Sequence, residues 1–228
     1  MAIDLNADIG EGGPHDDALL AVVSSANVAC GAHAGDLETM RAVCERAAAF
    51  GVRIGAHPGY PDREGFGRRE LGLSPAEIFQ TVAEQLAALG EIGPLAYVKL
   101  HGALYHRAGS DPDVAAVVVY AVERVGAPPV LLCPAGSALA LHAAARGFRV
   151  VSEGFADRRY GVDGELVPRT VVGSVLEAAE AAQQAVELAQ TGHFESLCIH
   201  GDGPHAEVTA AAVAAALQTA GIETAAFA

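Results

Sequence analysis

The sequence predicts an α/β protein folded as a (β/α) barrel, and three observations support this prediction. Short apolar runs alternate along the chain with longer segments of helical pattern, which is typical of parallel strands joined by crossover helices. The apolar runs are continuous rather than alternating, as in strands that are covered on both faces. Polar side chains follow nearly every run, as on the loops above a barrel, whereas an open doubly wound sheet needs them at one switch point.

Seven apolar runs are the expected strands, and two gaps between them are unusually long. One long loop extends from Pro58 to Leu73 and the other from Glu153 to Val172. Loops of this length in a compact domain are usually functional or act as lids. The expected strands are Ile3–Ala7, Asn27–Cys30, Val52–Ala56, Ala96–Leu100, Val130–Cys133, Phe148–Ser152 and Ser196–Ile199.

Residues that start and stop helices lie between these strands. The segment Ser74–Glu77 is a capping box with Pro75 at the first helical position. Asp36 can cap a helix that ends before Gly51. The expected helices cover Asp36–Phe50, a segment from Ser74 onward, Asp111–Gly126, Ser137–Arg146, Val175–Gln190 and His205–Ala220, with a weaker pattern over Asp16–Val23.

Composition and charge exclude several classes of protein. The chain has 228 residues and a formal net charge of −14, which argues against binding to nucleic acid or to an anionic membrane surface. No apolar run approaches the roughly 18 residues that a membrane-spanning helix needs. Asp4 and Asp8 interrupt the region where a signal peptide would be apolar, so we expect a cytoplasmic protein. Because no linker or internal repeat divides the chain, we expect a single domain over residues 1–228.

The cysteines suggest no disulfide or metal framework. Cys30, Cys44, Cys133 and Cys198 are widely spaced and form no C-x-x-C pair. Buried reduced thiols in a cytosolic protein are the expected state. Cys30 precedes Gly31 and could act as a nucleophile, but a buried strand cysteine is the preferred interpretation.

Lysine is almost absent from the chain. Of the 14 basic residues, one is lysine and the others are arginine. That residue, Lys99, stands at the end of an expected strand, close to His101. A compact ammonium can shift its pKa or act as a point charge in a small pocket, which a guanidinium cannot do. Lys99 is therefore a candidate functional residue, and chance survival of one lysine is the alternative interpretation.

Five of the nine histidines lie near the carboxyl ends of expected strands, where a barrel would bring them together. Histidine can act as an acid, a base or a metal ligand. A group of Asp8, His33, His57 and His200 could hold a divalent metal such as zinc or manganese, or it could orient a substrate and move protons without one. The five histidines are His33, His57, His101, His200 and His205.

The glycine-rich segments do not form a nucleotide site of a known kind. Gly10–Gly13 follows the first strand but lacks the G-x-G-x-x-G spacing, and the chain has no P-loop sequence. Arg68 and Arg69 follow the flexible segment Gly65–Gly67. This arginine pair could clamp a carboxylate or a phosphate, or it could belong to a solvated loop or a partner contact.

Several longer motifs resemble the LamB/YcsF family. The resemblance runs from the first expected strand to the last and covers nearly the whole chain. Ala32, Leu100 and Pro14–His15 depart from the family pattern, which alters pocket walls but removes no charged motif residue. The matching segments are Asp4–Gly12, Ser25–Gly31, His33–Asp36, Gly55–Asp62, Gly65–Arg69, Lys99 with His101–Tyr105, Phe155–Arg158 and His200–Asp202.

The resemblance implies a (β/α)7-type distorted TIM barrel of the glycoside hydrolase and deacetylase kind. It also implies ATP-dependent hydrolysis of the lactam of 5-oxo-L-proline to L-glutamate, carried out together with two partner subunits, B and C. ATP would then be handled wholly or partly by the partners, which agrees with the missing P-loop.

On this basis we expect Asp8, His57, Lys99 and His101 to be catalytic. Lys99 and an arginine would neutralise the developing negative charge. Asp8, His57 or His101 would activate water or protonate the ring nitrogen. The expected substrate-binding residues are Asn6, Glu11, Asn27, His33, Arg68, Tyr105, Glu153, Asp157, Arg158, His200 and Asp202.

Two other functions remain open from the sequence. The chain could be a stand-alone metal-dependent deacetylase or amidohydrolase, which would hold a tightly bound metal and act without ATP. It could also be a non-catalytic subunit that delivers a small acid to its partners. Metal content and dependence on ATP separate the first of these from a lactam hydrolase.

Overall fold

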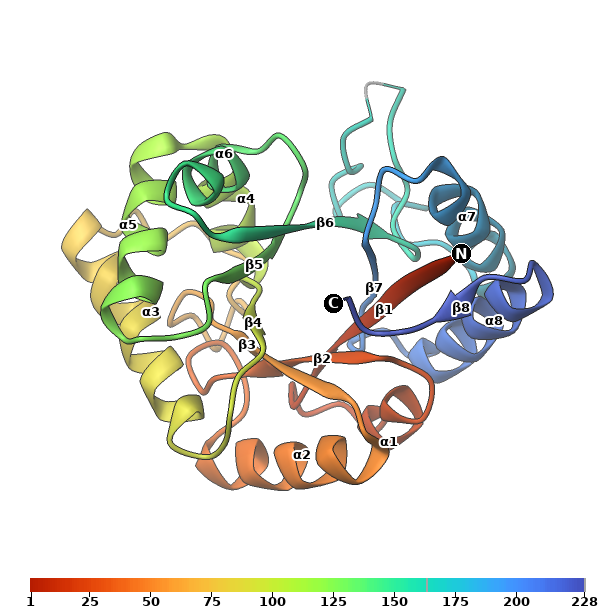
Figure 1. Cartoon of the computed structure of the whole chain (residues 1–228), viewed down its shortest axis with the longest axis horizontal. Helices are drawn as coiled ribbons and strands as arrows, with labels where there is room; N and C mark the ends of the chain where they lie inside the picture. The colour runs from red at the N-terminus through yellow and green to blue at the C-terminus, as the bar shows by residue number, and fades with distance from the viewer. Residues whose placement is uncertain (163, 228) are drawn as a thin grey trace.

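Seven parallel strands close into a barrel, as the sequence predicts. The computed structural model describes residues 1–162 and 164–227. Hydrogen bonding runs in order from β1 to β7, and β1 pairs with both β2 and β7, which closes the ring (Figure 1). The strands are β1 (Ala2–Ile9), β2 (Ser25–Ala29), β3 (Arg53–His57), β4 (Tyr97–Val98), β5 (Val130–Cys133), β6 (Arg149–Phe155) and β7 (Ser196–Ile199).

The helices pack around the outside of the ring (Figure 1). Asp36 accepts a hydrogen bond from the Thr39 amide at 2.8 Å, and Ser74 with Glu77 forms the complete capping box. Among the described residues, none of the helices has the length and apolar character needed to cross a membrane. The helices are α1 (Asp16–Leu20), α2 (Leu37–Phe50), α3 (Pro75–Gly90), α4 (Gly102–Ser110), α5 (Pro112–Arg124), α6 (Ala138–Ala145), α7 (Ala178–Thr191) and α8 (Ala206–Thr219).

Helix α4 and a short strand β8 (Glu223–Thr224) have no counterpart in the sequence prediction. α4 begins directly after His101, which makes no capping hydrogen bond through its side chain. No start residue therefore marks this helix in the sequence. β8 pairs with the start of β1 over two residues, which is too short to produce a periodic pattern.

The second long loop begins later than the sequence predicts. β6 continues beyond the predicted end at Ser152 and includes Glu153. α7 begins at Ala178 rather than Val175, because Val175 forms an antiparallel bridge with Arg158. The loop therefore covers residues 156–177, and Glu153 has the fixed position of a strand residue.

Side chains of the strands alternate between an apolar and a polar environment. Leu5 and Ala7 of β1 are fully buried in the apolar core shared with the helices. Asn6 and Asp8 are also buried, but they hydrogen-bond with side chains of other strands across the barrel interior. Because successive side chains of a strand point to opposite faces, the apolar core surrounds the barrel and a polar row lies within it.

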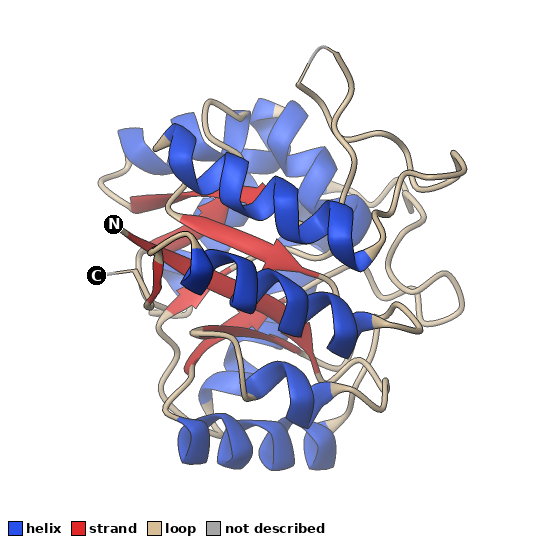
Figure 2. Ribbon diagram, turned by 90° about the vertical axis from the view of Figure 1, so that its right-hand side faces the viewer, coloured by secondary structure: helices blue, strands red, loops and turns tan. Residues whose placement is uncertain are grey.

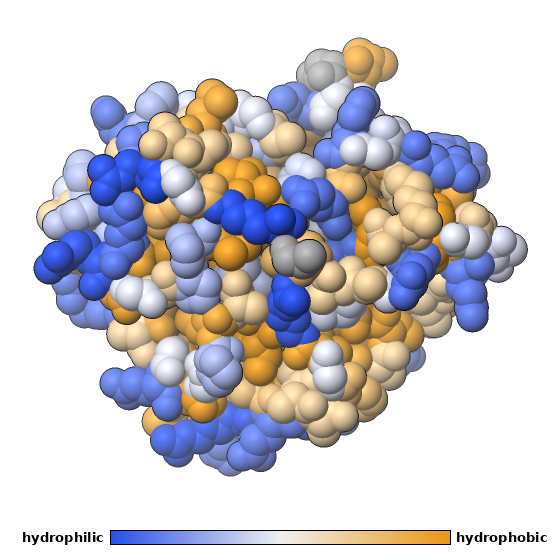
Figure 3. Space-filling model, in the orientation of Figure 1, coloured by the Kyte–Doolittle hydropathy of each residue, from blue (hydrophilic) through white to orange (hydrophobic). Residues whose placement is uncertain are grey.

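The amino-terminal end of the barrel is closed by an aromatic side chain. Phe227 packs against Tyr97, Leu132 and Val151, and the Arg53 guanidinium lies 5.3 Å from the centre of its ring. Figure 3 looks onto this end, where hydrophilic side chains gather around the middle of the face. Figure 2 shows the long loops at the opposite end, beyond the arrowheads of the strands. The two ends of the barrel therefore differ, because one is packed with side chains and the other bears the long loops.

Gly55 of β3 has no room for a side chain. A Cβ at this position would lie 2.3 Å from two ring carbons of the buried Tyr97. Gly55→Ala should therefore lower the free energy of unfolding by about 1–3 kcal/mol, the usual cost of overpacking. Gly90→Ala is the control, because no atom lies within 4 Å of a Cβ there and alanine favours the helix. Urea denaturation measures both changes, and equal values for the two variants would contradict the prediction.

Candidate active site

A cavity of about 510 Å³ lies at the loop-bearing end of the barrel. Its buried part includes Asp8 and Lys99, which are 4% and 2% exposed. Arg68, Arg158 and Arg169 also line it, and they come from the two long loops. A cavity with several basic side chains, in a chain of net charge −14, suits an anionic small molecule.

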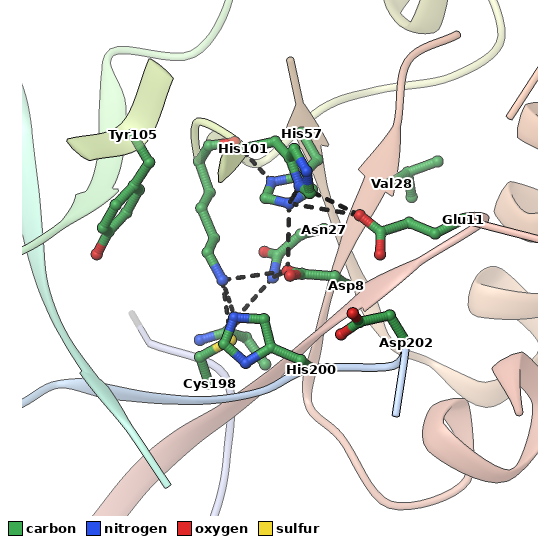
Figure 4. A network of polar contacts seen from close by, with 12 residues as sticks. Asp8, Glu11, Asn27, Val28, His57, His101, Tyr105, Cys198, His200 and Asp202 are labelled. Carbon is green, nitrogen blue, oxygen red and sulfur yellow. Dashed lines mark hydrogen bonds and ion pairs between the residues drawn. The ribbon is translucent and has the colours of Figure 1, made fainter. Parts of the chain in front are cut away.

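Lys99 is a buried ammonium held between two carboxylates. Its Nζ lies 2.9 Å from Glu153 Oε1 and 3.1 Å from Asp8 Oδ1. It also contacts Asn6 Oδ1 at 3.2 Å and Cys198 Sγ at 3.0 Å. Figure 4 shows the network of polar contacts around Asp8, with Asn27, His57 and Cys198 close to it. Burial disfavours the charged form, but the Asp8 carboxylate and its neighbours raise the pKa of Lys99 well above its usual value. The ammonium is therefore charged at neutral pH.

Asp8 is held as a carboxylate by side chains from several strands. Asn27 Nδ2 donates to Asp8 Oδ1 at 2.9 Å, and the Tyr97 hydroxyl donates to Asn27 Oδ1 at 2.7 Å. Burial opposes the ionisation of Asp8, but His57 and Lys99 hold its pKa well below the usual value. Asp8 therefore contributes a fixed negative charge next to the ammonium.

Glu153 connects the lysine to the wall of the cavity. Its Oε1 faces Lys99 and also accepts a hydrogen bond from Asn6 Nδ2 at 3.3 Å. Its Oε2 accepts a hydrogen bond from the Tyr105 hydroxyl at 2.7 Å. Burial and the neighbouring Glu153 charge raise the pKa of Tyr105 well above its usual value, so the hydroxyl remains a donor. Asn6 in turn donates to Ser196 Oγ at 2.8 Å.

His57 and His101 direct one ring nitrogen each toward the other. His57 Nδ1 lies 2.9 Å from the Lys99 carbonyl oxygen, and His101 Nε2 lies 2.8 Å from the Phe66 carbonyl oxygen. Because a carbonyl oxygen can only accept, both of these nitrogens carry protons. His57 Nε2 and His101 Nδ1 then face each other at 3.0 Å, with Glu11 Oε1 at 3.2 Å from the latter. Two lone pairs at this distance repel, so the pair is suited to hold one shared proton or one metal cation.

Glu11 and His33 complete the histidine cluster. His33 stacks on His101 with ring centroids 3.7 Å apart, and its Nε2 lies 3.1 Å from Glu11 Oε1. Burial alone would raise the pKa of Glu11, but hydrogen bonds from His101 and His33 bring it to about 2. Burial lowers the pKa of His33 to about 4. At neutral pH, Glu11 is therefore ionised and His33 is neutral.

His200 and Asp157 form a second pair suited to acid–base chemistry. His200 Nδ1 lies 3.0 Å from each carboxylate oxygen of Asp157, and the His200 amide donates to the same carboxylate at 3.0 Å. Burial would raise the pKa of Asp157, but His200 lowers it below the usual value. A carboxylate on Nδ1 orients the imidazole and leaves Nε2 to exchange a proton with a ligand in the cavity.

Two of the arginines that line the cavity share one carboxylate. Arg68 and Arg169 share Asp202, at 2.7 and 3.5 Å. Arg158 donates to the Val167 carbonyl at 2.7 Å, and burial together with the nearby Arg169 charge lowers its pKa. Because one carboxylate balances two guanidiniums, an anionic ligand can take over part of this pairing.

Within the described part of the chain, two groups of side chains could hold a metal ion. One consists of Asp8, Cys198 and His200. The Lys99 ammonium already lies within hydrogen-bond distance of the first two, so this group has a resident cation. The other group consists of Asp8, Glu11, His57 and His101, whose ligand atoms lie within 4.8 Å of one another.

The second group fits a metal ion by its chemistry. It offers two imidazole nitrogens and two ionised carboxylates, which suit zinc or manganese. It differs from the set expected from the sequence, because Glu11 and His101 take the places of His33 and His200. His33 instead holds Glu11, and His200 belongs to the group that contains Cys198.

The barrel brings the predicted site residues to one end of the molecule. The expected catalytic residues Asp8, His57, Lys99 and His101 all line the cavity. Asp157 holds His200, and Asp202 holds two arginines, without lining the cavity themselves. Asn6, Asn27 and Glu153 lie behind Lys99 and Asp8, whereas His205 lines an adjacent cavity of about 350 Å³.

The structure decides between alternatives that the sequence leaves open for Arg69 and Cys30. Arg69 does not line the cavity, because it pairs with Asp62 at 3.0 Å. Cys30 is buried and burial raises its pKa to about 12, which agrees with a structural thiol rather than a nucleophile. The contacts of Cys198 and of the Phe66 carbonyl were not expected from the sequence. A thiol in an apolar strand and a backbone oxygen leave no pattern in a sequence.

The chain matches one protein family along its length. The LamB/YcsF family profile matches residues 3–228. A protein of Streptomyces griseus subsp. griseus, named as the A subunit of 5-oxoprolinase, is 48% identical, and the match covers 99% of this chain and 100% of that protein. A protein of Heliobacterium modesticaldum with the same name is 44% identical, with 97% of this chain and 96% of that protein covered.

Solved structures share the fold. The lactam utilization protein from Thermus thermophilus has a TM-score of 0.92 and 39% identity, with 100% of both chains covered. The catalytic domain of a peptidoglycan N-acetylglucosamine deacetylase from Eubacterium rectale has a TM-score of 0.59 at 11% identity, with 100% of this chain and 88% of that chain covered. The second likeness concerns the fold alone. Together they confirm the predicted (β/α)7 barrel of the deacetylase kind.

The buried neutral His33 makes the protein sensitive to mild acid. Its pKa falls from an ordinary 6.5 to about 4 in the folded chain, so between these values the unfolded chain binds a proton that the folded chain excludes. The free energy of unfolding should therefore fall as the pH drops from 6.5 to 4, by up to about 1.4 kcal/mol per pH unit.

His33→Asn should flatten this slope, and His193→Asn, which alters an exposed histidine, is the control. Urea denaturation at several pH values between 7 and 4 measures the slope. An unchanged slope in His33→Asn would show that another group carries the acid sensitivity.

Proposed function

The chain belongs to the LamB/YcsF family, and on this premise we propose that it is the A subunit of an ATP-dependent 5-oxoprolinase, which hydrolyses the lactam of 5-oxo-L-proline to L-glutamate. The names of the relatives and of the Thermus thermophilus protein support this proposal. The observation that carries it within the chain is the cavity in which the Lys99 ammonium lies between Asp8 and Glu153, with arginines in the same wall.

The substrate offers two polar groups that match this cavity. Its carboxylate suits the guanidiniums of Arg68, Arg158 and Arg169, because carboxylates pair with guanidinium in a bidentate manner. Its amide carbonyl oxygen would then approach Lys99, whose fixed charge stabilises negative charge that develops on this oxygen. The ring nitrogen would face the histidines of the cavity.

A five-membered lactam is a stable amide, so its carbonyl needs activation before water can attack. ATP would transfer its γ-phosphoryl group to the amide oxygen. Water then adds to the carbon while a base takes its proton, and the carbon–nitrogen bond breaks as the nitrogen gains a proton. The acyl phosphate that remains is hydrolysed to glutamate and phosphate. His57 with His101, and His200 oriented by Asp157, are the groups that hold and move these protons.

ATP is handled by partners in this proposal. The chain has no P-loop sequence, and the relatives are named as one subunit of a larger enzyme. We therefore assign phosphoryl transfer to two partner subunits, B and C. This chain would receive the lactam or its phosphorylated form in the cavity.

We also propose that Asp8, Glu11, His57 and His101 bind a divalent cation. A cation bound there would lower the pKa of a coordinated water molecule. The chain's own contribution is to keep both carboxylates ionised and to fix the imidazole orientations through backbone carbonyls. The same group favours one alternative function, a metal-dependent deacetylase or amidohydrolase that acts without ATP or partners.

Reconstitution tests the proposed function. Subunits B and C should form glutamate from 5-oxo-L-proline, with ATP consumed, only when this chain is added. Glutamate formation by this chain without ATP, or hydrolysis of an acetylated sugar by the chain alone, would favour the alternative function. Full activity of B and C without this chain would contradict the proposal.

Asp8→Asn should reduce glutamate formation by the complex about 10²-fold or more, because the variant removes a fixed charge and a proton acceptor. Lys99→Met should have an effect of the same size. Asp113→Asn, which changes an exposed residue of α5, is the matched control. Circular dichroism checks that each variant folds. Near-normal turnover by both folded site variants would mean that the chemistry takes place elsewhere. If these variants also still bind the substrate, this chain would be a subunit that delivers the substrate to its partners.

Metal binding can be tested on the chain alone. Zn²⁺ or Mn²⁺ added to metal-free protein should raise the melting temperature, since a cation that binds only the folded state stabilises it. Glu11→Gln should abolish this rise, whereas Cys198→Ser, which alters the other group, should retain it. Differential scanning fluorimetry and elemental analysis measure the two effects. The reverse pattern would assign the metal to the group with Cys198.

A further inference from the structure

Phe66 has an unusual backbone conformation for a bulky residue. Its φ is 55°, and among the described residues it is the one non-glycine position with a positive φ. The left-handed region is unfavourable for side chains of this size, because the Cβ approaches backbone oxygen atoms. Such strain persists only where the surrounding structure holds it, and it concentrates at functional sites.

Two hydrogen bonds of the following residue hold the loop at Phe66. The amide of the next residue, Gly67, donates to the Asp62 carbonyl at 2.8 Å, and the Gly67 carbonyl accepts from the Ala103 amide at 2.9 Å. The loop also approaches the histidine cluster closely, because a Cβ on Gly67 would lie 2.8 Å from His101 Cδ2. The Phe66 carbonyl is thereby brought to 2.8 Å from His101 Nε2.

The ring of Phe66 explains why this position is not glycine. It packs edge-on against His101 and His33, with ring centroids 5.5 and 5.9 Å away. The Arg68 guanidinium lies 4.9 Å from the centre of the same ring. Glycine would adopt the backbone conformation without strain but would remove these contacts. The position therefore combines a strained backbone with a side chain that packs on the cluster.

We infer that Phe66 is a positioning residue for His101. Its left-handed backbone directs the carbonyl at His101 Nε2 and fixes the tautomer with the proton on this nitrogen. His101 Nδ1 is thereby directed at His57 Nε2 and at the Glu11 carboxylate, where it can share a proton with His57. With a relaxed backbone the carbonyl would turn away, and the His101 proton would move to Nδ1, where it can donate to Glu11. The inference concerns the histidine pair itself and holds whether or not the substrate is a lactam.

Two substitutions separate the backbone of Phe66 from its ring. Phe66→Asn removes the ring, but asparagine tolerates the left-handed region. Phe66→Val places a β-branched side chain where it opposes that region. Phe79→Val is the matched control, because this phenylalanine lies in α3 and packs against Tyr120, away from the cluster.

Long-range ¹H–¹⁵N spectra of the full chain, labelled with ¹⁵N-histidine, distinguish the two tautomers of each ring. The His101 signals are assigned by their loss in His101→Gln. We expect the proton on Nε2 in the unsubstituted chain, in Phe66→Asn and in Phe79→Val, and a shift of the proton to Nδ1 in Phe66→Val. A proton on Nδ1 in the unsubstituted chain, or the same His101 tautomer in Phe66→Val and Phe66→Asn, would overturn the inference.

Kinetics of the reconstituted complex provide the second readout. Phe66→Val should lower kcat about 10²-fold, the scale of lost acid–base catalysis, with a smaller effect on KM. Phe66→Asn should lose less activity than Phe66→Val. Equal losses in kcat would mean that the ring, rather than the backbone, positions His101. Because the spectra require no substrate, they decide the inference even if the complex proves to have another activity.

Discussion

The charge of Lys99 inside the barrel is the constraint on which the rest of the site depends. A buried ammonium costs several kcal/mol unless opposite charges and hydrogen bonds compensate it. Asp8 and Glu153 provide the charges, and Asn6 provides a further oxygen. These groups are themselves buried, so each needs partners of its own. The barrel interior is polar because each buried group needs such partners. For the same reason, its side chains form specific pairs between different strands.

The two ends of the barrel have different roles. The amino-terminal end is filled by Phe227 with Tyr97 and apolar side chains, which excludes water from below the network. The loop-bearing end leaves Lys99 accessible from the cavity and places arginines in its wall. This acidic chain thus places three arginines where a small anion can enter, and its net negative charge opposes the binding of polyanions.

The sequence allowed much of this arrangement to be predicted, for a physical reason. In a parallel barrel, every residue that follows a strand lies at the same end, so the polar residues at the strand ends are also the residues of the site. Which side chains pair with one another could not be predicted in the same way. Arg69 adjoins Arg68 in sequence, yet it turns to Asp62, and Glu11 joins two histidines that nothing in the spacing connects to it. Contacts of backbone oxygens, such as that of Phe66, depend on loop geometry and leave no residue type to recognise.

Closure of the ring between β1 and β7 also has a consequence for how the protein is made. The hydrogen bond between Asn6 and Ser196 joins residues that are 190 positions apart in the chain. β1, the first strand of the barrel, therefore keeps one edge unpaired until β7 has been synthesised. Such distant pairing slows folding and leaves an exposed strand edge open to wrong partners in the meantime. Asp8 and Lys99 are both present long before that point, but the cage around the ammonium is completed only when β7 arrives. Assembly of the site and completion of the fold are therefore the same event.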